Sequence, residues 1–155
     1  MAQKLIDRTL DNALLICDGA QTFTSSSGTV TRVNNIETSF DLGPGVTDFD
    51  VVVDASSVAV PNNNESCMLY VVGGATALSQ TYLLGMMPLG YSATFQALTS
   101  RQAGRYLLRC SNVVGNAAAN YADQDLITAR WVMIIVQCGG TAPSAKFKAY
   151  LVKKS

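Results

Sequence analysis

Residues 130–152 read RWVMIIVQCGGTAPSAKFKAYLV, and this stretch decides the fold. The apolar run from Val132 to Val136 is rich in β-branched residues and predicts a strand covered on both faces. The Gly, Pro and Ser residues of 139–144 tolerate turn geometry. Lysines and Tyr150 then alternate with apolar residues, which is typical of a strand with one wet face. We therefore expect a central strand, a hairpin connection and a closing outer strand.

The rest of the chain carries further short apolar runs separated by Gly, Pro and Asn, and no long stretch has the spacing of a helix. Turns are expected at Asp18-Gly19 and around Pro88-Leu89-Gly90. This pattern predicts an all-β protein, a jelly-roll or Greek-key β-sandwich of about eight strands. The strands expected before the closing hairpin are 12–17, 28–33, 49–53, 66–72, 80–86, 93–98 and 105–110.

The domain organisation is simple, because no internal repeat and no linker divides the 155 residues. This length suits one domain with a sizeable core. We expect a single β-sandwich over residues 1–155, with residues 1–11 as an amino-terminal arm. Within that arm, the spacing of residues 5–10 fits a short helical turn and also an extended segment.

Charge is scarce and balanced: 14% of the residues are charged, with 11 Lys and Arg against 11 Asp and Glu. Soluble domains average roughly 25%. The zero net charge lacks the basic footprint of nucleic-acid binding. No apolar stretch reaches the roughly 18 residues of a membrane span, and the charged amino terminus does not match a secretory signal. A surface with so few charges is typical of a protein whose surface is largely covered by other protein molecules.

The four cysteines, Cys17, Cys67, Cys110 and Cys138, are widely spaced and form no C-x-x-C pair. Buried, reduced thiols are the expected state in a chain made in a cytoplasm. A disulfide is the alternative, because the spatial proximity that decides it cannot be derived from spacing.

Catalytic chemistry is poorly supplied, since the chain contains no histidine. This excludes Ser-His-Asp and Cys-His catalysis and most zinc sites. Asp48 and Asp50 share a strand face as a glycosidase pair would, but the one Trp, Trp131, is expected in the core and not beside a sugar. Asp123 and Asp125 could supply calcium ligands, although solvated loop residues are the favoured reading. We expect no enzyme, no cofactor and no metal.

Cationic side chains are the candidate partner contacts. Arg105 and Arg109 alternate onto one strand face, where guanidinium groups could pair with a partner's carboxylates or within the sheet. Arg101 lies close by in the sequence. Lys146 and Lys148 form the wet face of the last strand, where a solvated edge is the alternative to a binding role.

Several segments together resemble a known family. They are 40–45 (FDLGPG), the strand 48–53 (DFDVVV), 105–109 (RYLLR), and the last hairpin, 139–144 (GGTAPS) leading to 149–152 (AYLV). The chain resembles the capsid cement (decoration) proteins of tailed phages, of the kind carried by a short-tailed Bordetella phage.

The resemblance implies a jelly-roll subunit on the outside of an icosahedral head. There it would assemble as a dimer or another homo-oligomer, bind the major capsid protein and staple neighbouring capsomers. Many copies would sum weak contacts into avidity that resists internal DNA pressure. It further implies a virion protein made in the bacterial cytoplasm, with no nucleic-acid or membrane partner. The alternative is a carbohydrate- or receptor-binding jelly roll.

Overall fold

The computed structural model describes residues 15–24, 27–29, 38–43, 48–74, 82–92, 103–111, 113–115 and 126–153. These residues form eleven β-strands and no helix, which confirms the predicted all-β class. The strands are β1 (Leu15–Phe23), β2 (Ser27–Thr29), β3 (Ser39–Asp41), β4 (Asp48–Ala59), β5 (Glu65–Gly74), β6 (Tyr82–Ser92), β7 (Gly104–Ser111), β8 (Val113–Gly115), β9 (Leu126–Thr128), β10 (Trp131–Gly139) and β11 (Ser144–Lys153).

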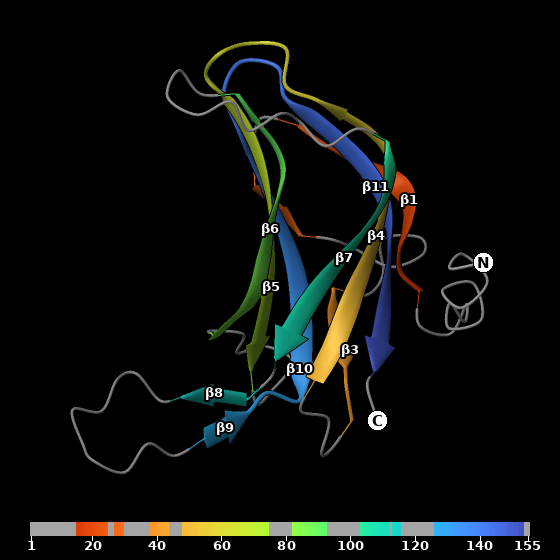
Figure 1. The fold of residues 1–155 in the computed structure, drawn as a ribbon, viewed down its shortest axis with the longest axis vertical. Coiled ribbons are helices and arrows are strands. Elements are labelled where there is room, and N and C mark those ends of the chain that lie inside the picture. Colours follow the sequence, from red (N-terminus) through yellow and green to blue (C-terminus); the bar gives the residue numbers. More distant parts are fainter. Residues whose placement is uncertain are drawn as a thin grey trace.

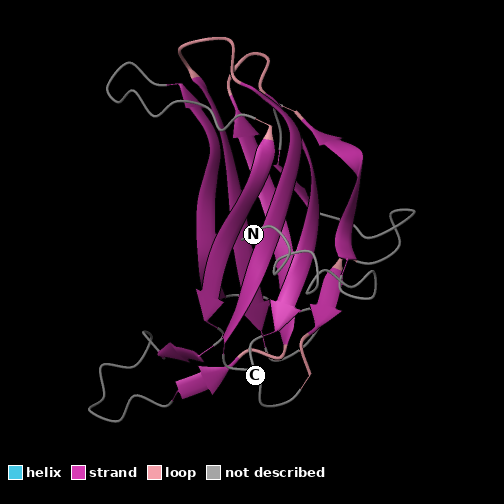
Figure 2. Ribbon diagram, turned by 45° about the vertical axis from the view of Figure 1, so that its right-hand side comes forward, coloured by secondary structure: helices cyan, strands magenta, loops and turns pink. Residues whose placement is uncertain are grey.

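Two antiparallel sheets face each other and form a β-sandwich (Figures 1 and 2). The four-stranded sheet has the order β1-β11-β4-β7. The five-stranded sheet has the order β2-β10-β5-β6, and β3 also pairs with β10. The short strands β8 and β9 pair with each other below the two sheets, as Figure 1 is drawn.

The core fills the space between the sheets, because alternate residues of each strand point inward. Phe147 of β11 is fully buried and stacks on Phe23 of β1, with ring centroids 5.3 Å apart. Leu69 of β5 and Ile134 of β10 belong to the same buried cluster. The long apolar strands thus form one core that both sheets share.

The last two strands correct the expected closing hairpin. β10 pairs with β5, β2 and β3, whereas β11 lies in the other sheet between β1 and β4. The connection between them crosses from one sheet to the other, so the prediction of a paired hairpin with an outer edge strand is wrong. The reading of Lys146 and Lys148 as lysines on a solvated edge fails with it, because β11 has a neighbour on each side.

The apolar run of β10 is covered on one face only. Val132, Ile134 and Val136 are buried, while Met133 and Ile135, which alternate with them, are half-buried. The prediction of two covered faces is therefore wrong for this chain on its own. The outward positions hold residue types that are usually buried.

Glu65 fixes the crossover between the sheets. Its buried carboxylate accepts hydrogen bonds from the backbone N–H of Ala142 (2.6 Å) and from the side-chain and backbone nitrogens of Asn62 (2.6 and 2.9 Å). Burial raises the pKa of Glu65, but these three hydrogen bonds outweigh it and leave the pKa below its ordinary value. Gly140, at φ 105°, lies against this carboxylate.

Both predicted glycine turns lie inside strands. β1 passes through Asp18-Gly19 with an irregular register, and Gly19 has φ 80°. β6 runs through Pro88-Leu89-Gly90 with a register shift nearby. Pro88 is compatible with β6 because this strand is the edge of its sheet, and edge strands tolerate proline. The arm 1–11, residues 30–33 of the predicted strand 28–33 and the predicted strand 93–98 lie outside the described residues.

The cysteines depart from the expectation of reduced thiols. Cys67 and Cys138 lie directly opposite each other on β5 and β10 and form a disulfide, with Cα atoms 4.1 Å apart. The residues are 71 positions apart in sequence, so only the strand pairing brings them together. Cys17 and Cys110 are buried thiols as predicted, and burial raises the pKa of Cys17.

Candidate binding surfaces

The outward side of the five-stranded sheet is apolar across three strands. Its cross-strand rows bring Ile135 of β10 beside Tyr70 of β5, which lies beside Met86 of β6. Leu83 and Met86 expose 54% and 56% of their surface. We call this surface the apolar face. It consists of Trp131, Met133 and Ile135 of β10, Met68, Tyr70 and Val72 of β5, and Leu83, Met86 and Pro88 of β6.

An ion pair borders the apolar face beside Trp131. Arg130 donates two hydrogen bonds to the Asp41 carboxylate, at 2.9 and 2.6 Å, and its guanidinium lies 5.9 Å from the centre of the Trp131 ring. The bond from Arg130, together with one from the Gly43 N–H, lowers the pKa of Asp41 to about 2. An apolar centre with a charged border is the arrangement of many protein–protein interfaces.

Trp131 was expected in the core, and this prediction is wrong. The ring stands on the outward side of β10 and is half-buried. Its position follows from the alternation of the strand, since Val132 takes the adjacent inward place. The ring thereby adds to the apolar face.

The outward side of the four-stranded sheet is charged, with signs that alternate from strand to strand. Asp18, Lys148, Asp54 and Arg105 occupy one row across β1, β11, β4 and β7. Asp54 and Arg105 form an ion pair at 3.2 Å. We call this surface the charged face. It also includes the buried Asp50 and the exposed Arg109 in a parallel row, with Tyr150, the buried Val52 and Leu107 between the two rows.

The predicted contact residues gather on the charged face. Arg105 and Arg109 are exposed on β7 as the alternation predicted, and Lys146 and Lys148 lie outward on β11. Arg105 pairs within its own sheet, the alternative that the sequence left open. Arg101 lies outside the described residues.

The apolar face was not predicted from the sequence. The sequence features that indicate it are Met133 and Ile135, at the outward positions of an apolar run, and the apolar residues Leu83 and Met86 of the edge strand β6. A run that is apolar at every position is compatible with a strand buried on both faces inside one domain. It is also compatible with a strand whose outward face is covered only by a binding partner. The order of the strands in the sheet is needed to show which outward side chains lie next to each other.

In the described residues, no group of three or more His, Cys, Asp or Glu is placed where it could hold a metal ion. Asp48 is exposed, whereas Asp50 is buried opposite Arg109, so the two carboxylates do not share one open cleft. Asp123 and Asp125 lie outside the described residues. Across the described part of the chain, no helix is long and apolar enough to span a membrane.

No protein-family model matches the sequence, and comparison with curated proteins returns no match.

Proposed function

We propose that this protein is a capsid decoration protein that binds the outside of an icosahedral phage head and staples neighbouring capsomers of the major capsid protein. The observation that carries the proposal is the apolar face. A folded domain rarely exposes a continuous patch of Met, Leu, Tyr and Trp unless another surface covers it. Two of its members, Leu83 and Met86, leave more than half of their surface to solvent.

The order of the strands supports a jelly roll. In that fold a long hairpin wraps so that its first strand pairs with its last, its second with its seventh, its third with its sixth and its fourth with its fifth. If β2 and β3 are counted as one interrupted strand, the main sheets contain the pairs β1 with β11, β2/β3 with β10, β4 with β7 and β5 with β6.

The partner is proposed from the family resemblance and from the composition. With 14% charged residues and no histidine, the chain is better supplied for covering surface than for chemistry. A decoration protein acts in many copies, so each contact can be modest while the sum stabilises the shell. Assembly as a dimer or another homo-oligomer belongs to the same proposal.

The test is to compare head particles that carry this protein with particles that lack it. Mass spectrometry of purified virions should find the chain in high copy number, and its loss should lower the temperature at which heads release DNA. Absence of the chain from virions, or particles of unchanged heat and pressure stability, would contradict the stapling role.

A second candidate, a carbohydrate- or receptor-binding module, is favoured by the half-buried aromatic rings of Trp131 and Tyr70 on the apolar face. Aromatic faces can stack against sugar rings. A glycan array decides the matter: binding that Trp131→Ala removes would favour this candidate, and an empty array would leave the structural role.

A further inference from the structure

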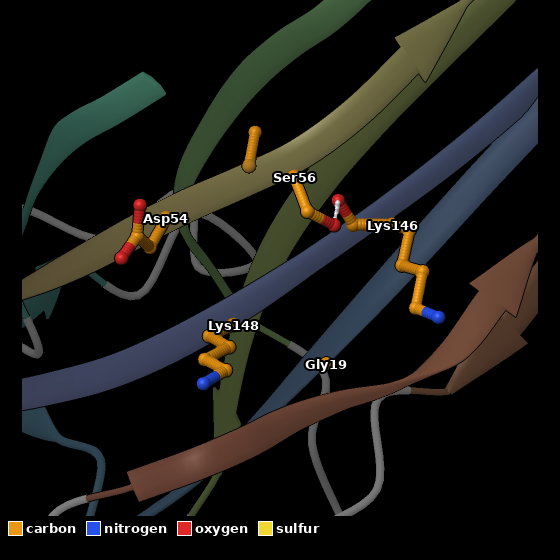
Figure 3. Close-up of a pocket in the computed structure, with 6 residues that line it drawn as sticks. Gly19, Asp54, Ser56, Lys146 and Lys148 are labelled. Atoms are coloured by element: carbon orange, nitrogen blue, oxygen red, sulfur yellow. Dashed lines mark hydrogen bonds between the residues drawn. The ribbon is translucent and has the colours of Figure 1, made fainter. Parts of the chain in front are cut away.

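The charged face contains an open groove of about 400 Å³ whose floor is β11 (Figure 3). Lys146 and Lys148 extend from this floor, while Asp54 and Ser56 stand on β4 and Gly19 on β1. The groove lies on the four-stranded sheet, and the apolar face lies on the other sheet. The two surfaces therefore point to opposite sides of the sandwich.

The groove opens because both neighbours of β11 bulge at the same level. Between Asp18 and Thr22, β1 has three residues where β11 has only Phe147. On the other side, Ser56 is an extra residue between the partners of Lys146 and Phe147. Bulges often re-aim side chains near functional sites.

Gly19 shapes the wall of the groove. At φ 80° it adopts a backbone conformation that side chains rarely allow, and a Cβ there would lie 2.9 Å from Cγ of Lys148. The missing side chain lets the stem of Lys148 lie directly against β1. Lys148 thereby lines the groove while it remains exposed to solvent.

Among the described residues, positive charges outnumber negative ones in and around the groove. Asp54 is paired with Arg105 at 3.2 Å, and Oδ1 of Asp18 accepts a hydrogen bond from the N–H of Ala20 at 2.9 Å. Within the described residues no ion pair closes on the ammonium of Lys146 or Lys148. Among the described residues of the groove and of the Asp18–Arg105 row, three cations (Lys146, Lys148 and Arg105) stand against two carboxylates (Asp18 and Asp54).

We propose that this groove binds a single carboxylate on an extended segment of a partner protein, held between the Lys146 and Lys148 ammonium groups. The two lysines are two positions apart on one strand, so their Cα atoms are about 7 Å apart and can bracket one small anion. Lysine suits this role as a flexible point charge with several donors.

A carboxylate fits better than a phosphate. A phosphate group near neutral pH carries close to two negative charges, whereas a carboxylate carries one. Asp18 and Asp54, on either side of Lys148, would repel the additional negative charge of the phosphate. A nucleic-acid strand brings a row of phosphates, which the alternating signs of the charged face would oppose. The inference goes beyond the proposed function, because it stands on this groove and not on the apolar face.

The experiment is an NMR titration of the ¹⁵N-labelled full chain with the peptide acetyl-Gly-Gly-Glu-Gly-Gly-amide. The same peptide with Gln in place of Glu is the control. We expect saturable shifts of the Gly19, Ser56, Lys146 and Lys148 amides with the Glu peptide, and binding at least five-fold weaker with the Gln peptide. The double variant Lys146→Gln/Lys148→Gln should weaken binding at least five-fold, whereas Lys153→Gln, on the same strand outside the groove, should not.

Three results would overturn the groove assignment. They are equal binding of the Glu and Gln peptides, unchanged binding by a double variant whose spectrum remains that of the folded protein, or tighter binding of inorganic phosphate than of the Glu peptide. None of them bears on attachment through the apolar face, so failure here and failure of the proposed function are distinguishable.

Discussion

The two outward sheet surfaces of this protein differ although the strands beneath them are built alike. On both sheets the inward residues are apolar and buried in one core. On the charged face the outward residues form cross-strand rows in which Asp54 already pairs with Arg105. On the apolar face the rows bring Tyr70 beside Met86, and no charged residue interrupts them. A surface whose rows carry charges of both signs is suited to water, whereas the apolar face gains free energy when another surface covers it.

The first prediction tests whether stability resides in the inward side of both sheets. Phe147→Ala should lower the free energy of unfolding by about 3–5 kcal/mol, because it removes a fully buried ring that stacks on Phe23. Leu107→Ala, at an exposed outward position, should change it by less than about 0.5 kcal/mol. Urea unfolding measures both, and similar losses would contradict the separation of inward and outward roles.

The second prediction concerns the crossover that carries the chain from one sheet to the other. Gly140→Ala should cost about 2 kcal/mol, because a Cβ at φ 105° would lie 2.6 Å from both the Asn64 carbonyl oxygen and Cγ of Glu65. Gly139→Ala is the matched control, since its Cβ would meet only Ser66 Oγ at an ordinary 3.5 Å. If the midpoint temperature of thermal unfolding falls equally for both variants, Glu65 does not fix this turn.

The sequence predicts the direction of side chains within a strand, but not the sheet to which a strand belongs. The alternation of Arg105 and Leu107 with Tyr106 and Leu108 predicted the two sides of β7, because side-chain direction is a local property of a strand. The assignment of β11 to the other sheet was missed, since it depends on contacts with β1 and β4, far away in sequence.

The two candidate surfaces were predictable to different degrees. Lys146 and Lys148 were identified from their alternation, but the groove between them requires the bulges of both neighbouring strands. The Asp18-Gly19 pair indicated a turn when it marks one of these bulges, because the same glycine conformation serves both. The Cys67–Cys138 disulfide likewise depends on strand register.

The third prediction examines the charged face by its salt dependence. Asp54→Asn should lower the free energy of unfolding by less than about 1 kcal/mol, because the pair with Arg105 is partly solvent-exposed. The loss should shrink as salt is raised towards 1 M, where screening is strong. A larger loss, or one that salt does not change, would mean that the charged face is a structural element and not a solvated surface.

The fourth and smallest effect is a pH response at the border of the apolar face. The pKa of Asp41 is lowered to about 2, so its pairing with Arg130 contributes stability above the ordinary carboxyl range and loses it as pH falls through about 2. The chain has one Trp, and Arg130 lies over its ring, so tryptophan fluorescence should report this step. Asp41→Asn should remove the transition; persistence of the transition in that variant would assign it to another group.

The most direct test of the central claim compares two exposed apolar residues on opposite surfaces. Met86 on the apolar face and Leu107 on the charged face are similarly exposed, at 56% and 53%. The measurement is the affinity of Met86→Lys and Leu107→Lys for capsid shells that lack the protein. We expect Met86→Lys to weaken binding at least ten-fold, about 1.4 kcal/mol, and Leu107→Lys to change it less than about two-fold. Equal losses, or a larger loss for Leu107→Lys, would contradict attachment through the apolar face.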